Sequence, residues 1–315
     1  MSSRVFISIC IPAYKHVDYL KRLLDSIVIQ TFKDFEVVIT DDSPGNEVEQ
    51  FCLQYQSLLP IKYIRNNTSL GSPGNWNACI SNANGQWIKI MHDDDWFANT
   101  ESLQHFAKVA SANHNASFIF SGFKEVDIEN NFEKESVISS VYLGLLRKSP
   151  LTLFKKNFIG HPSTTLVKNN IQYFYDENFK WVVDIEFYIR YLTGHKNFVV
   201  IRSSLVNIGI NKDQITKLAF RNPAIEIPEV FGLFEKLPEG CLKNIFCYDY
   251  YWRFIRNLSI KDEATVKKYA PGIEIPLPLK RMIQKQKNIS AKMLRKGIIS
   301  KTLMLRSYIL DFGKL

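Results

Sequence analysis

The first third of the chain alternates short apolar runs with stretches in which apolar residues recur at helical spacing. The run Phe6–Ile11 predicts a strand. After it, leucine, isoleucine and valine recur three or four positions apart between residues 20 and 28, which predicts an amphipathic helix. The rhythm continues, with further strands expected at Phe35–Ile39, Ile61–Arg65 and Trp87–Met91. Strands that alternate with helices predict an α/β fold with a mostly parallel sheet covered on both faces.

Beyond residue 100 the pattern is less regular. Helices are expected at Leu103–Ala112 and Asp184–Leu192, and two short strands at Phe198–Ile201 and Leu205–Ile208. Residues 124–148 are polar and variable and predict no element. The last part of the chain reads as helical.

Acidic clusters follow two of the expected strands directly. Asp41-Asp42-Ser43 follows the second strand, and His92-Asp93-Asp94-Asp95 follows the fourth. Because ligands of open α/β sheets bind beyond the carboxyl ends of the strands, we expect both clusters to face one crevice.

Three consecutive aspartates are costly neighbours, since like charges raise one another's pKa. A divalent cation removes that cost, and oxygen ligands favour Mg²⁺, Mn²⁺ or Ca²⁺. The alternative is a solvated acidic turn or a helix N-cap, where aspartate is common.

Composition limits the class of protein. A hydrophobic share of 46% over 315 residues excludes a disordered chain, and no apolar run approaches the roughly 18 residues of a membrane-spanning helix. The five cysteines are odd in number and lack CxxC spacing, which predicts buried thiols in a reducing compartment. They do not suit a disulfide framework or a zinc site.

The net charge of +9 resides at one end of the chain. Residues 280–315 hold ten lysines and arginines and one acidic residue, so the preceding part is neutral. Apolar residues are interleaved with these cations. Three interpretations stay open: a helix packed on the body with solvated lysines, contact with an anionic membrane surface, or contact with nucleic acid.

Several short motifs stand in a fixed order over about residues 4–97. They are Ile9-Cys10-Ile11-Pro12-Ala13-Tyr14, Gln30-Thr31-Phe32, Asp41-Asp42-Ser43, then Asn67, Gly71, Asn77, Ala83, Gly85 and Ile88, and finally Asp93-Asp94-Asp95. In this order and spacing they resemble the opening of family 2 glycosyltransferases. The resemblance implies a GT-A fold with a Rossmann-like nucleotide-sugar-binding half at residues 1–100 and an acceptor-binding half at 101–225. Residues 226–315 would form a helical, basic C-terminal extension.

The resemblance also implies roles for single residues near the donor. Pro12, Ala13 and Tyr14 would line the nucleotide pocket. Asp41 would bond the base, and Asp94 would reach the ribose.

Further residues of the expected donor site follow from the same resemblance. Asp93 and Asp95 would form the DxD motif and bind the metal, with Asp95 as the preferred direct ligand, and His92 stands where many members have an aspartate. Asn77 would belong to the nucleotide-sugar site. Arg65 is proposed to contact phosphate, with an ordinary surface arginine as the alternative.

The catalytic base is expected on the acceptor side. Phe179–Phe187 resembles the segment that carries it in the family, which points to Asp184, with Glu186 in reserve. The helical period separates these two side chains by about 200°, so one of them faces the site. Gly160–Thr165 resembles an acceptor-side loop of some members, although its hydroxyls are also expected to satisfy their own backbone.

The resulting hypothesis is an inverting glycosyltransferase that uses Mn²⁺ or Mg²⁺. It would move a sugar from a nucleotide-sugar, expected to be a UDP-sugar with GDP or dTDP left open, to the hydroxyl of a glycan or a lipid-linked saccharide. We expect a cytoplasmic enzyme of surface-polysaccharide assembly that contacts the inner membrane face through residues 280–315, without a nucleic-acid partner. The alternatives are a non-catalytic glycan- or nucleotide-sugar-binding protein and a sugar nucleotidyltransferase. Dehydrogenase GxGxxG and kinase GxxxxGK[ST] motifs are absent.

Overall fold

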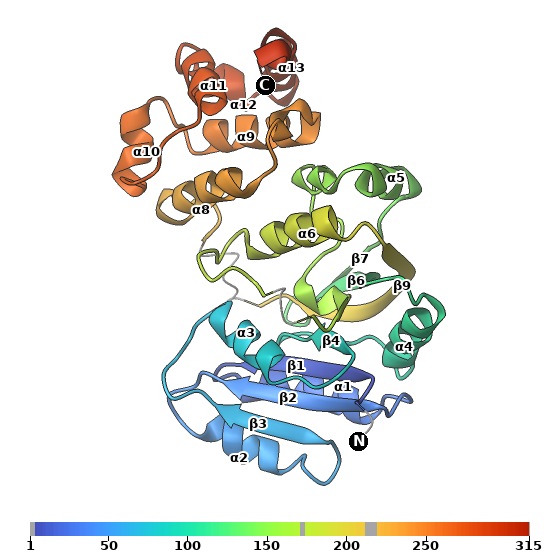
Figure 1. Ribbon diagram of the computed structural model, residues 1–315. Helices are drawn as coiled ribbons and strands as arrows, with labels where there is room; N and C mark the ends of the chain where they lie inside the picture. The colour runs from blue at the N-terminus through green and yellow to red at the C-terminus, as the bar shows by residue number, and fades with distance from the viewer. Residues whose placement is uncertain (1–3, 171–173, 212–218, 315) are drawn as a thin grey trace. The chain divides into compact units, whose positions relative to one another are not determined.

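The computed structural model describes residues 4–170, 174–211 and 219–314, and the chain divides into two compact units. The first comprises Met1–Leu143, Phe158–Glu177 and Tyr191–Lys212, and the second Gly144–Asn157, Asn178–Arg190 and Asp213–Leu315. The first unit contains the whole β-sheet, and the second is helical (Figure 1). The three-part division expected from the sequence stays a prediction.

The first unit begins with four strands and three helices in strict alternation. These are β1 (Ile7–Ala13), α1 (Val17–Val28), β2 (Phe35–Asp41), α2 (Glu47–Leu53), β3 (Ile61–Arg65), α3 (Gly74–Ser81) and β4 (Trp87–Ile90). The four strands are parallel in the order β3-β2-β1-β4. The predicted Rossmann-like half is therefore confirmed.

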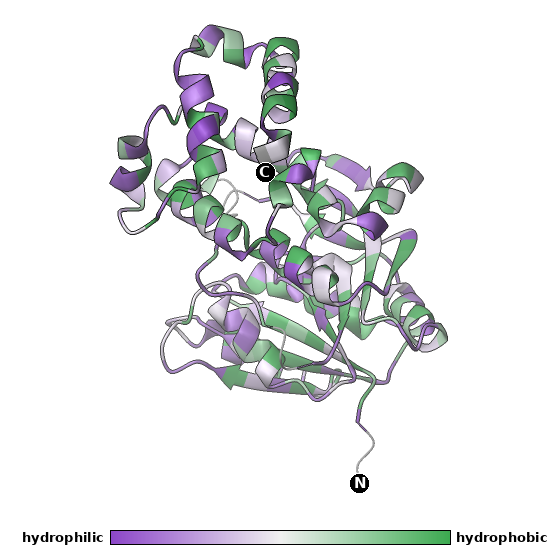
Figure 2. Ribbon diagram, turned by 45° about the horizontal axis from the view of Figure 1, so that its top comes forward, coloured by the Kyte–Doolittle hydropathy of each residue, from purple (hydrophilic) through white to green (hydrophobic). Residues whose placement is uncertain are grey.

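Alternate residues of β1 face opposite sides of the sheet, and both sides are covered. On one side Ile7, Ile9 and Ile11 pack with Leu20 and Leu24 of α1 in a fully buried core. On the other side α3 lies against β1 and β2 (Figure 1), with apolar and thiol side chains between them. Figure 2 shows the strands as mostly hydrophobic, as burial on both faces requires.

The rest of the sheet mixes strand directions. Its elements are β5 (Trp96–Phe97), α4 (Ser102–Ala112), β6 (Phe118–Asp127), β7 (Phe132–Ser136), η2 (Pro162–Thr164), β8 (Thr165–Lys168) and β9 (Phe198–Gly209). β8 is antiparallel to β4 and β6, whereas β9 is parallel to β6. The two short strands predicted at 198–201 and 205–208 are one strand, whose register against β6 shifts on either side of Gly122.

The second unit is built of helices around aromatic side chains. They are η1 (Pro150–Phe154), α8 (Pro223–Lys236), η3 (Cys241–Lys243), α9 (Ile245–Asn257), α10 (Glu263–Tyr269), α11 (Leu277–Lys287), α12 (Ala291–Arg295), α13 (Gly297–Asp311) and η4 (Phe312–Lys314). Two more helices, α5 (Ser140–Lys148) and α6 (Val183–Gly194), each cross a unit boundary. Of the helices described, none combines the length and apolar character needed to span a bilayer. All five cysteines are buried free thiols, so the predicted burial is confirmed.

Candidate active site

The two acidic clusters lie at the carboxyl ends of β2 and β4, on either side of β1. β2, β1 and β4 are adjacent and parallel, so Asp41 and the loop after β4 lie at one edge of the sheet. The loop after β1 touches both clusters. The Tyr14 backbone N–H donates to Oδ2 of Asp93 at 3.5 Å, and the Lys15 N–H donates to the Ser43 hydroxyl at 2.8 Å.

The three residues expected to line a nucleotide pocket differ in exposure. Pro12 and Ala13 are buried at the end of β1, where they pair with Thr40 and Asp41. Tyr14 is 44% exposed, and the Lys15 ammonium lies 4.6 Å from the centre of its ring. Tyr14 is thus the member of this trio with a side chain free to meet a ligand from solvent.

Asp41 is completely buried at the end of β2. Its Oδ1 accepts the Ser43 N–H at 2.8 Å, and its Oδ2 accepts the Tyr63 hydroxyl at 2.7 Å. These two bonds fix the carboxylate in one orientation. A carboxylate has about four lone-pair sites, so acceptor capacity remains for a further donor.

The neighbouring Asp42 anchors the loop between β3 and α3, a role that the sequence did not indicate. Its carboxylate accepts the backbone N–H groups of Leu70 at 3.1 Å and Gly71 at 2.7 Å, and the Asn66 amide at 2.6 Å. With the Ser69 hydroxyl at 3.3 Å, four donors surround this carboxylate and order a loop that is otherwise rich in serine, glycine and asparagine. This loop therefore has a defined position beside Asp41.

Arg65 and Asn77 are tied to other parts of the first unit. Arg65, exposed at the end of β3, donates to the Pro44 carbonyl at 2.9 Å. The Asn77 amide donates to the Tyr175 carbonyl at 2.8 Å and to Glu177 at 3.0 Å, and its oxygen accepts the Tyr175 N–H. Asn77 thus holds α3 against residues 175–177, and a ligand contact by its side chain would replace one of these bonds.

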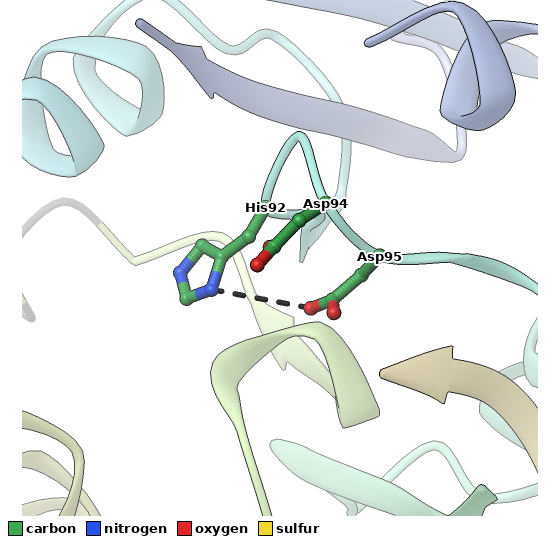
Figure 3. A group of neighbouring side chains, drawn as sticks. All are labelled: His92, Asp94 and Asp95. Carbon is green, nitrogen blue, oxygen red and sulfur yellow. Dashed lines mark ion pairs between the residues drawn. The ribbon is translucent and has the colours of Figure 1, made fainter. Parts of the chain in front are cut away.

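His92, Asp94 and Asp95 form a compact group after β4. One potential ligand atom from each lies within 4.8 Å of the others, and Nδ1 of His92 is 4.0 Å from Oδ2 of Asp95 (Figure 3). Asp93 is not a member, because its carboxylate turns to the Tyr14 N–H. The sequence paired Asp93 with Asp95, and the geometry groups Asp94 and His92 with Asp95 instead.

The chain fixes both aspartates of this group from β9 and the residues after it. The Gly209 N–H donates to Oδ1 of Asp95 at 3.1 Å, and the Asn211 amide donates to Oδ2 of Asp94 at 2.8 Å. A Cβ at position 209 would lie 2.3 Å from the Asp94 carbonyl, so this close approach requires glycine. Arg22 donates to the same carbonyl at 2.9 Å.

Two buried ligand-type atoms of the group lack hydrogen-bond partners among the described residues. They are Oδ2 of Asp95, whose residue is 1% exposed, and Nε2 of His92. The His92 ring packs against the Trp76 ring with 4.6 Å between the ring centres and a tilt of 38°, and the His92 backbone N–H donates to the Ser163 hydroxyl at 3.0 Å. An orphaned carboxylate oxygen in the interior is costly, which points to a positive group as its missing partner.

Burial dominates the electrostatics of the group. It raises the pKa of Asp93 to about 8 and raises the pKa values of Asp94 and Asp95, and the Asp94 charge adds to the effect on its two neighbours. Burial also lowers the pKa of His92 to about 3, so its imidazole is neutral. Repulsion between the aspartates, which the sequence led us to expect, therefore contributes less than burial and acts only from Asp94 on its two neighbours. A neutral imidazole beside crowded carboxylates is the ligand form that binds metals.

A buried lysine lies beneath the group and escaped the sequence analysis. Lys89 of β4 is fully buried, donates to the Ser163 carbonyl and lies 4.7 Å from the Phe106 ring centre. Burial lowers its pKa to about 7, while the Asp95 charge opposes the shift. The sequence does not indicate Lys89 as a site residue, because a lysine in a strand is expected to face solvent.

The segment Gly160–Thr165 contacts the loop of His92, Asp94 and Asp95 through Ser163, and the hydroxyls of its two threonines are bonded to backbone carbonyls. Thr164 Oγ1 donates to the Ile159 carbonyl at 2.7 Å, and Thr165 Oγ1 donates to the Pro162 carbonyl at 2.8 Å. Thr164 and Thr165 thus satisfy their own backbone, as expected, whereas the Ser163 hydroxyl accepts the His92 N–H.

The predicted base and its reserve lie at the start of α6, in the second unit. Asp184 is half-buried; its Oδ2 accepts the Asn157 amide at 2.8 Å, and its Oδ1 accepts the Ile185 N–H at 2.8 Å. Glu186 is 2% exposed and is held by Arg190 through two bonds of 2.6 and 3.0 Å. Glu186 is therefore committed to an ion pair, which leaves Asp184 as the candidate.

The start of α6 is positioned by Glu229, a residue that the sequence analysis did not select. This buried side chain of α8 accepts the N–H groups of Trp181 at 2.7 Å and Val182 at 3.1 Å. The first N–H groups of a helix have no partner within it, and a negative charge is favourable there.

Replacing Glu229 with alanine is expected to destabilise the protein by about 1–3 kcal/mol, because two buried N–H groups lose their acceptor. Urea denaturation followed by circular dichroism measures the change. Glu235→Ala, at an exposed position of the same helix, is the matched control. Equal stability of the two variants would contradict the assigned role.

Sequence comparisons identify relatives over most of the chain. The family described as Glycosyl transferase family 2 matches residues 8–180. An uncharacterized glycosyltransferase of Methanocaldococcus jannaschii is 27% identical over 254 residues, which cover 78% of this chain and 84% of that protein. The poly(ribitol-phosphate) beta-N-acetylglucosaminyltransferase TarS of Staphylococcus aureus is 26% identical over 178 residues. That match covers 54% of this chain but only 30% of TarS.

Comparison of structures shows the same fold in solved glycosyltransferases. S. aureus TarS 1–349 in complex with UDP-GlcNAc has a TM-score of 0.62 at 16% identity and covers 96% of this chain and 89% of its own. The mannosyltransferase PcManGT of Pyrobaculum calidifontis, in complex with GDP-Man and Mn²⁺, has a TM-score of 0.59 at 13% identity, with 98% and 87% covered. The fold is GT-A, as the sequence predicted.

Proposed function

The chain belongs to Glycosyl transferase family 2 and is a glycosyltransferase, and we propose that it transfers a sugar from a UDP-sugar to an acceptor hydroxyl with inversion at the anomeric carbon. The proposed donor site rests on one observation above all: the buried Oδ2 of Asp95 accepts no hydrogen bond from any described residue. It is grouped with Asp94 and His92 at the edge of the sheet that also holds Asp41.

The residues of this group fit a divalent cation. Two carboxylates and a neutral imidazole supply oxygen and nitrogen ligands, a set that suits Mn²⁺. We propose that Asp94, Asp95 and His92 hold the cation, and that Asp93 stays on the nucleotide side next to Tyr14. When bound, such a cation offsets the negative charge that grows on a departing diphosphate.

The residues to which we assign donor binding all lie in the first unit, and their positions there suggest the role of each. Asp41 has acceptor capacity left for a base N–H, and the exposed Tyr14 ring offers a face for the base. Pro12 and Ala13 support the strand end beneath it. For Arg65 we propose a phosphate contact, because its guanidinium is exposed next to Asp41 in the strand register.

Asn77 takes a different place in the proposal. Its side chain holds α3 to the segment around Tyr175, so we propose that it shapes the nucleotide-sugar site through this helix.

We propose Asp184 as the base that takes the proton from the acceptor hydroxyl as the new glycosidic bond forms. The Asn157 amide orients its carboxylate, and Glu229 fixes the helix start that carries it. The hydroxyl attacks the anomeric carbon from the face opposite the diphosphate. A single displacement of this kind gives a β-linked product from an α-linked donor.

Nucleotide-sugar binding in neighbouring structures supports the choice of donor class. TarS is solved with UDP-GlcNAc and PcManGT with GDP-Man and Mn²⁺. We propose UDP because TarS is similar to this chain in sequence as well as in fold. As acceptor we propose a glycan or a lipid-linked saccharide of surface-polysaccharide assembly at the cytoplasmic membrane face.

A panel of UDP-, GDP- and dTDP-sugars, screened with Mn²⁺, tests the proposal. A ligand that binds only the native state raises the melting temperature, so a UDP-sugar is expected to do so. Release of UDP with that sugar then demonstrates turnover. Stabilisation without nucleotide release, even with saccharide acceptors present, would favour the non-catalytic binding protein.

His92 is expected to make the proposed site prefer Mn²⁺ to Mg²⁺, and this preference can be measured. Replacing His92 with aspartate is expected to shift the ratio of Mg²⁺ to Mn²⁺ affinity toward Mg²⁺ by about tenfold, because carboxylates favour Mg²⁺ whereas imidazole does not. Displacement of Mn²⁺ by Mg²⁺, followed by electron paramagnetic resonance, reports this ratio without any turnover. His114→Asp, at an exposed position of the first unit, is the control. An unchanged ratio in His92→Asp would remove His92 from the ligand set.

A further inference from the structure

Helix α13 exposes a row of apolar side chains to solvent, and its opposite, mostly polar side packs against other helices of the second unit. Ile298 is 86% exposed, Leu305 39% and Ile309 71%. At 100° per residue these three side chains lie within about 40° of one another on the helix surface. Phe312, just beyond the helix, is 47% exposed. In Figure 2 hydrophobic segments recur along the helix that leads to the C-terminus.

The buried side of α13 is mostly polar. Its buried residues are Ser300, Met304, Ser307 and Asp311. Most helices of globular proteins bury their apolar stripe, so α13 is inverted relative to that rule.

Specific bonds hold the helix in this orientation. The Ser300 hydroxyl accepts a bond of 3.1 Å from Arg256, and the Trp252 indole donates to it at 3.4 Å. Asp311 accepts bonds from the Lys285 ammonium at 2.7 Å and the Tyr248 hydroxyl at 3.0 Å. Turning α13 to bury its apolar row would break these bonds, so the outward direction of the row is a property of the fold.

Several exposed cations lie close to the apolar row in the chain. Arg306 of α13, Lys296 directly before it, and Lys292 and Arg295 of α12 are exposed, and none of these four forms an ion pair with any residue that the structure describes. Three other cations of the region are paired: Lys280 with Glu263, Lys285 with Asp311 and Lys301 with Asp249. The exposed apolar row therefore belongs to a part of the chain that carries unbalanced positive charge.

We propose that this α13 surface (Ile298, Leu305, Ile309 and Phe312 with Lys292, Arg295, Lys296 and Arg306) docks on an anionic lipid membrane. Helices that lie in a membrane interface combine an apolar face with flanking lysine and arginine, and anionic headgroups attract those cations. A second copy of the chain is a poorer occupant, because a twofold interface would bring the same unbalanced cations together. The inference goes beyond the proposed transfer reaction and does not depend on it.

Sedimentation of the full chain with vesicles tests the docking. We expect binding to phosphatidylcholine vesicles that contain phosphatidylglycerol, weaker binding to pure phosphatidylcholine, and loss of binding as salt is raised. Ile298→Ser/Ile309→Ser is expected to lower the partition constant by about tenfold or more, because two apolar side chains no longer leave water. Arg295→Gln/Arg306→Gln should lower it on anionic vesicles only.

A matched control uses exposed apolar residues of the first unit. Ile128 is 61% and Val141 71% exposed, so Ile128→Ser/Val141→Ser removes equivalent side chains elsewhere and should leave vesicle binding unchanged. Point variants are preferable to deleting Lys280–Leu315, because that deletion also removes the buried Met282, Ile283 and Met304. Melting curves verify that each variant is folded.

Three outcomes would overturn the proposal. The first is equal vesicle binding by the wild type and Ile298→Ser/Ile309→Ser. The second is binding that does not depend on phosphatidylglycerol. The third is that Ile298→Ser/Ile309→Ser changes the oligomeric state in sedimentation velocity but leaves vesicle binding unchanged. This result would assign the apolar row to contact with a second copy of the chain. None of these readouts involves sugar transfer, so they leave the proposed reaction to its own tests.

Discussion

Asp184→Asn is expected to reduce turnover by about 10²–10⁴-fold, the usual contribution of a general base. The substitution keeps the shape of the side chain and removes its ability to take a proton. Asn157 and the Ile185 N–H now hold the carboxylate, and an asparagine oxygen still accepts one of these bonds. Donor binding should change little, because the proposed donor residues belong to the first unit.

Release of UDP in the presence of acceptor measures the first effect, and calorimetric titration with UDP-sugar measures the second. Glu239→Gln, exposed in the second unit, provides a charge-matched control and should behave as wild type. Turnover of Asp184→Asn at the wild-type rate would move the base to another residue.

Asp95→Asn is expected to abolish Mn²⁺-dependent donor binding while the protein stays folded. The amide oxygen still accepts the Gly209 N–H, so the local structure keeps this bond. What disappears is the charge on the buried Oδ2, which accepts no hydrogen bond from any described residue. A neutral amide is a poor replacement for a carboxylate ligand, and we expect the Mn²⁺ affinity to fall by about 100-fold, near 3 kcal/mol.

Titration of Mn²⁺ followed by electron paramagnetic resonance, with and without UDP-sugar, checks this expectation. Asp18→Asn, at an exposed position in the first turn of α1, is the control. Wild-type Mn²⁺ affinity in Asp95→Asn, or full activity of the wild type in EDTA, would exclude the cation from the account.

The fold of the first hundred residues follows from the sequence because each element has a clear period. Later elements lack that signal for physical reasons. β7 is an exposed edge strand whose residues are nearly all solvated, so no alternation of apolar side chains marks it. β9 was divided in two because Arg202 and Ser203 interrupt its apolar run at the point where the register against β6 shifts. The orientation of α13 also has no signal in the sequence, because its apolar residues lie on several sides of the helix, the buried Met304 among them.

The sequence predicts those parts of the site that lie at the carboxyl ends of the strands. The rule that ligands bind at the carboxyl ends of parallel strands located Asp41 and the cluster after β4. The partners that orient these groups come from far along the chain. Asn211 lies 117 positions from the Asp94 that it bonds, and Gly209 lies 114 positions from Asp95. Contacts over such separations leave no local pattern. The pairing of Asp93 with Asp95 follows from the resemblance to the DxD motif of the family and stays a prediction.

We propose that a nucleotide-sugar binds through a cation held by His92, Asp94 and Asp95. Anomalous diffraction at the manganese edge, from crystals grown with Mn²⁺ and UDP, would locate this cation. We expect a manganese peak bonded to these three side chains and to the diphosphate, with the uracil next to Asp41. A manganese peak elsewhere, or UDP bound away from this sheet edge, would contradict it.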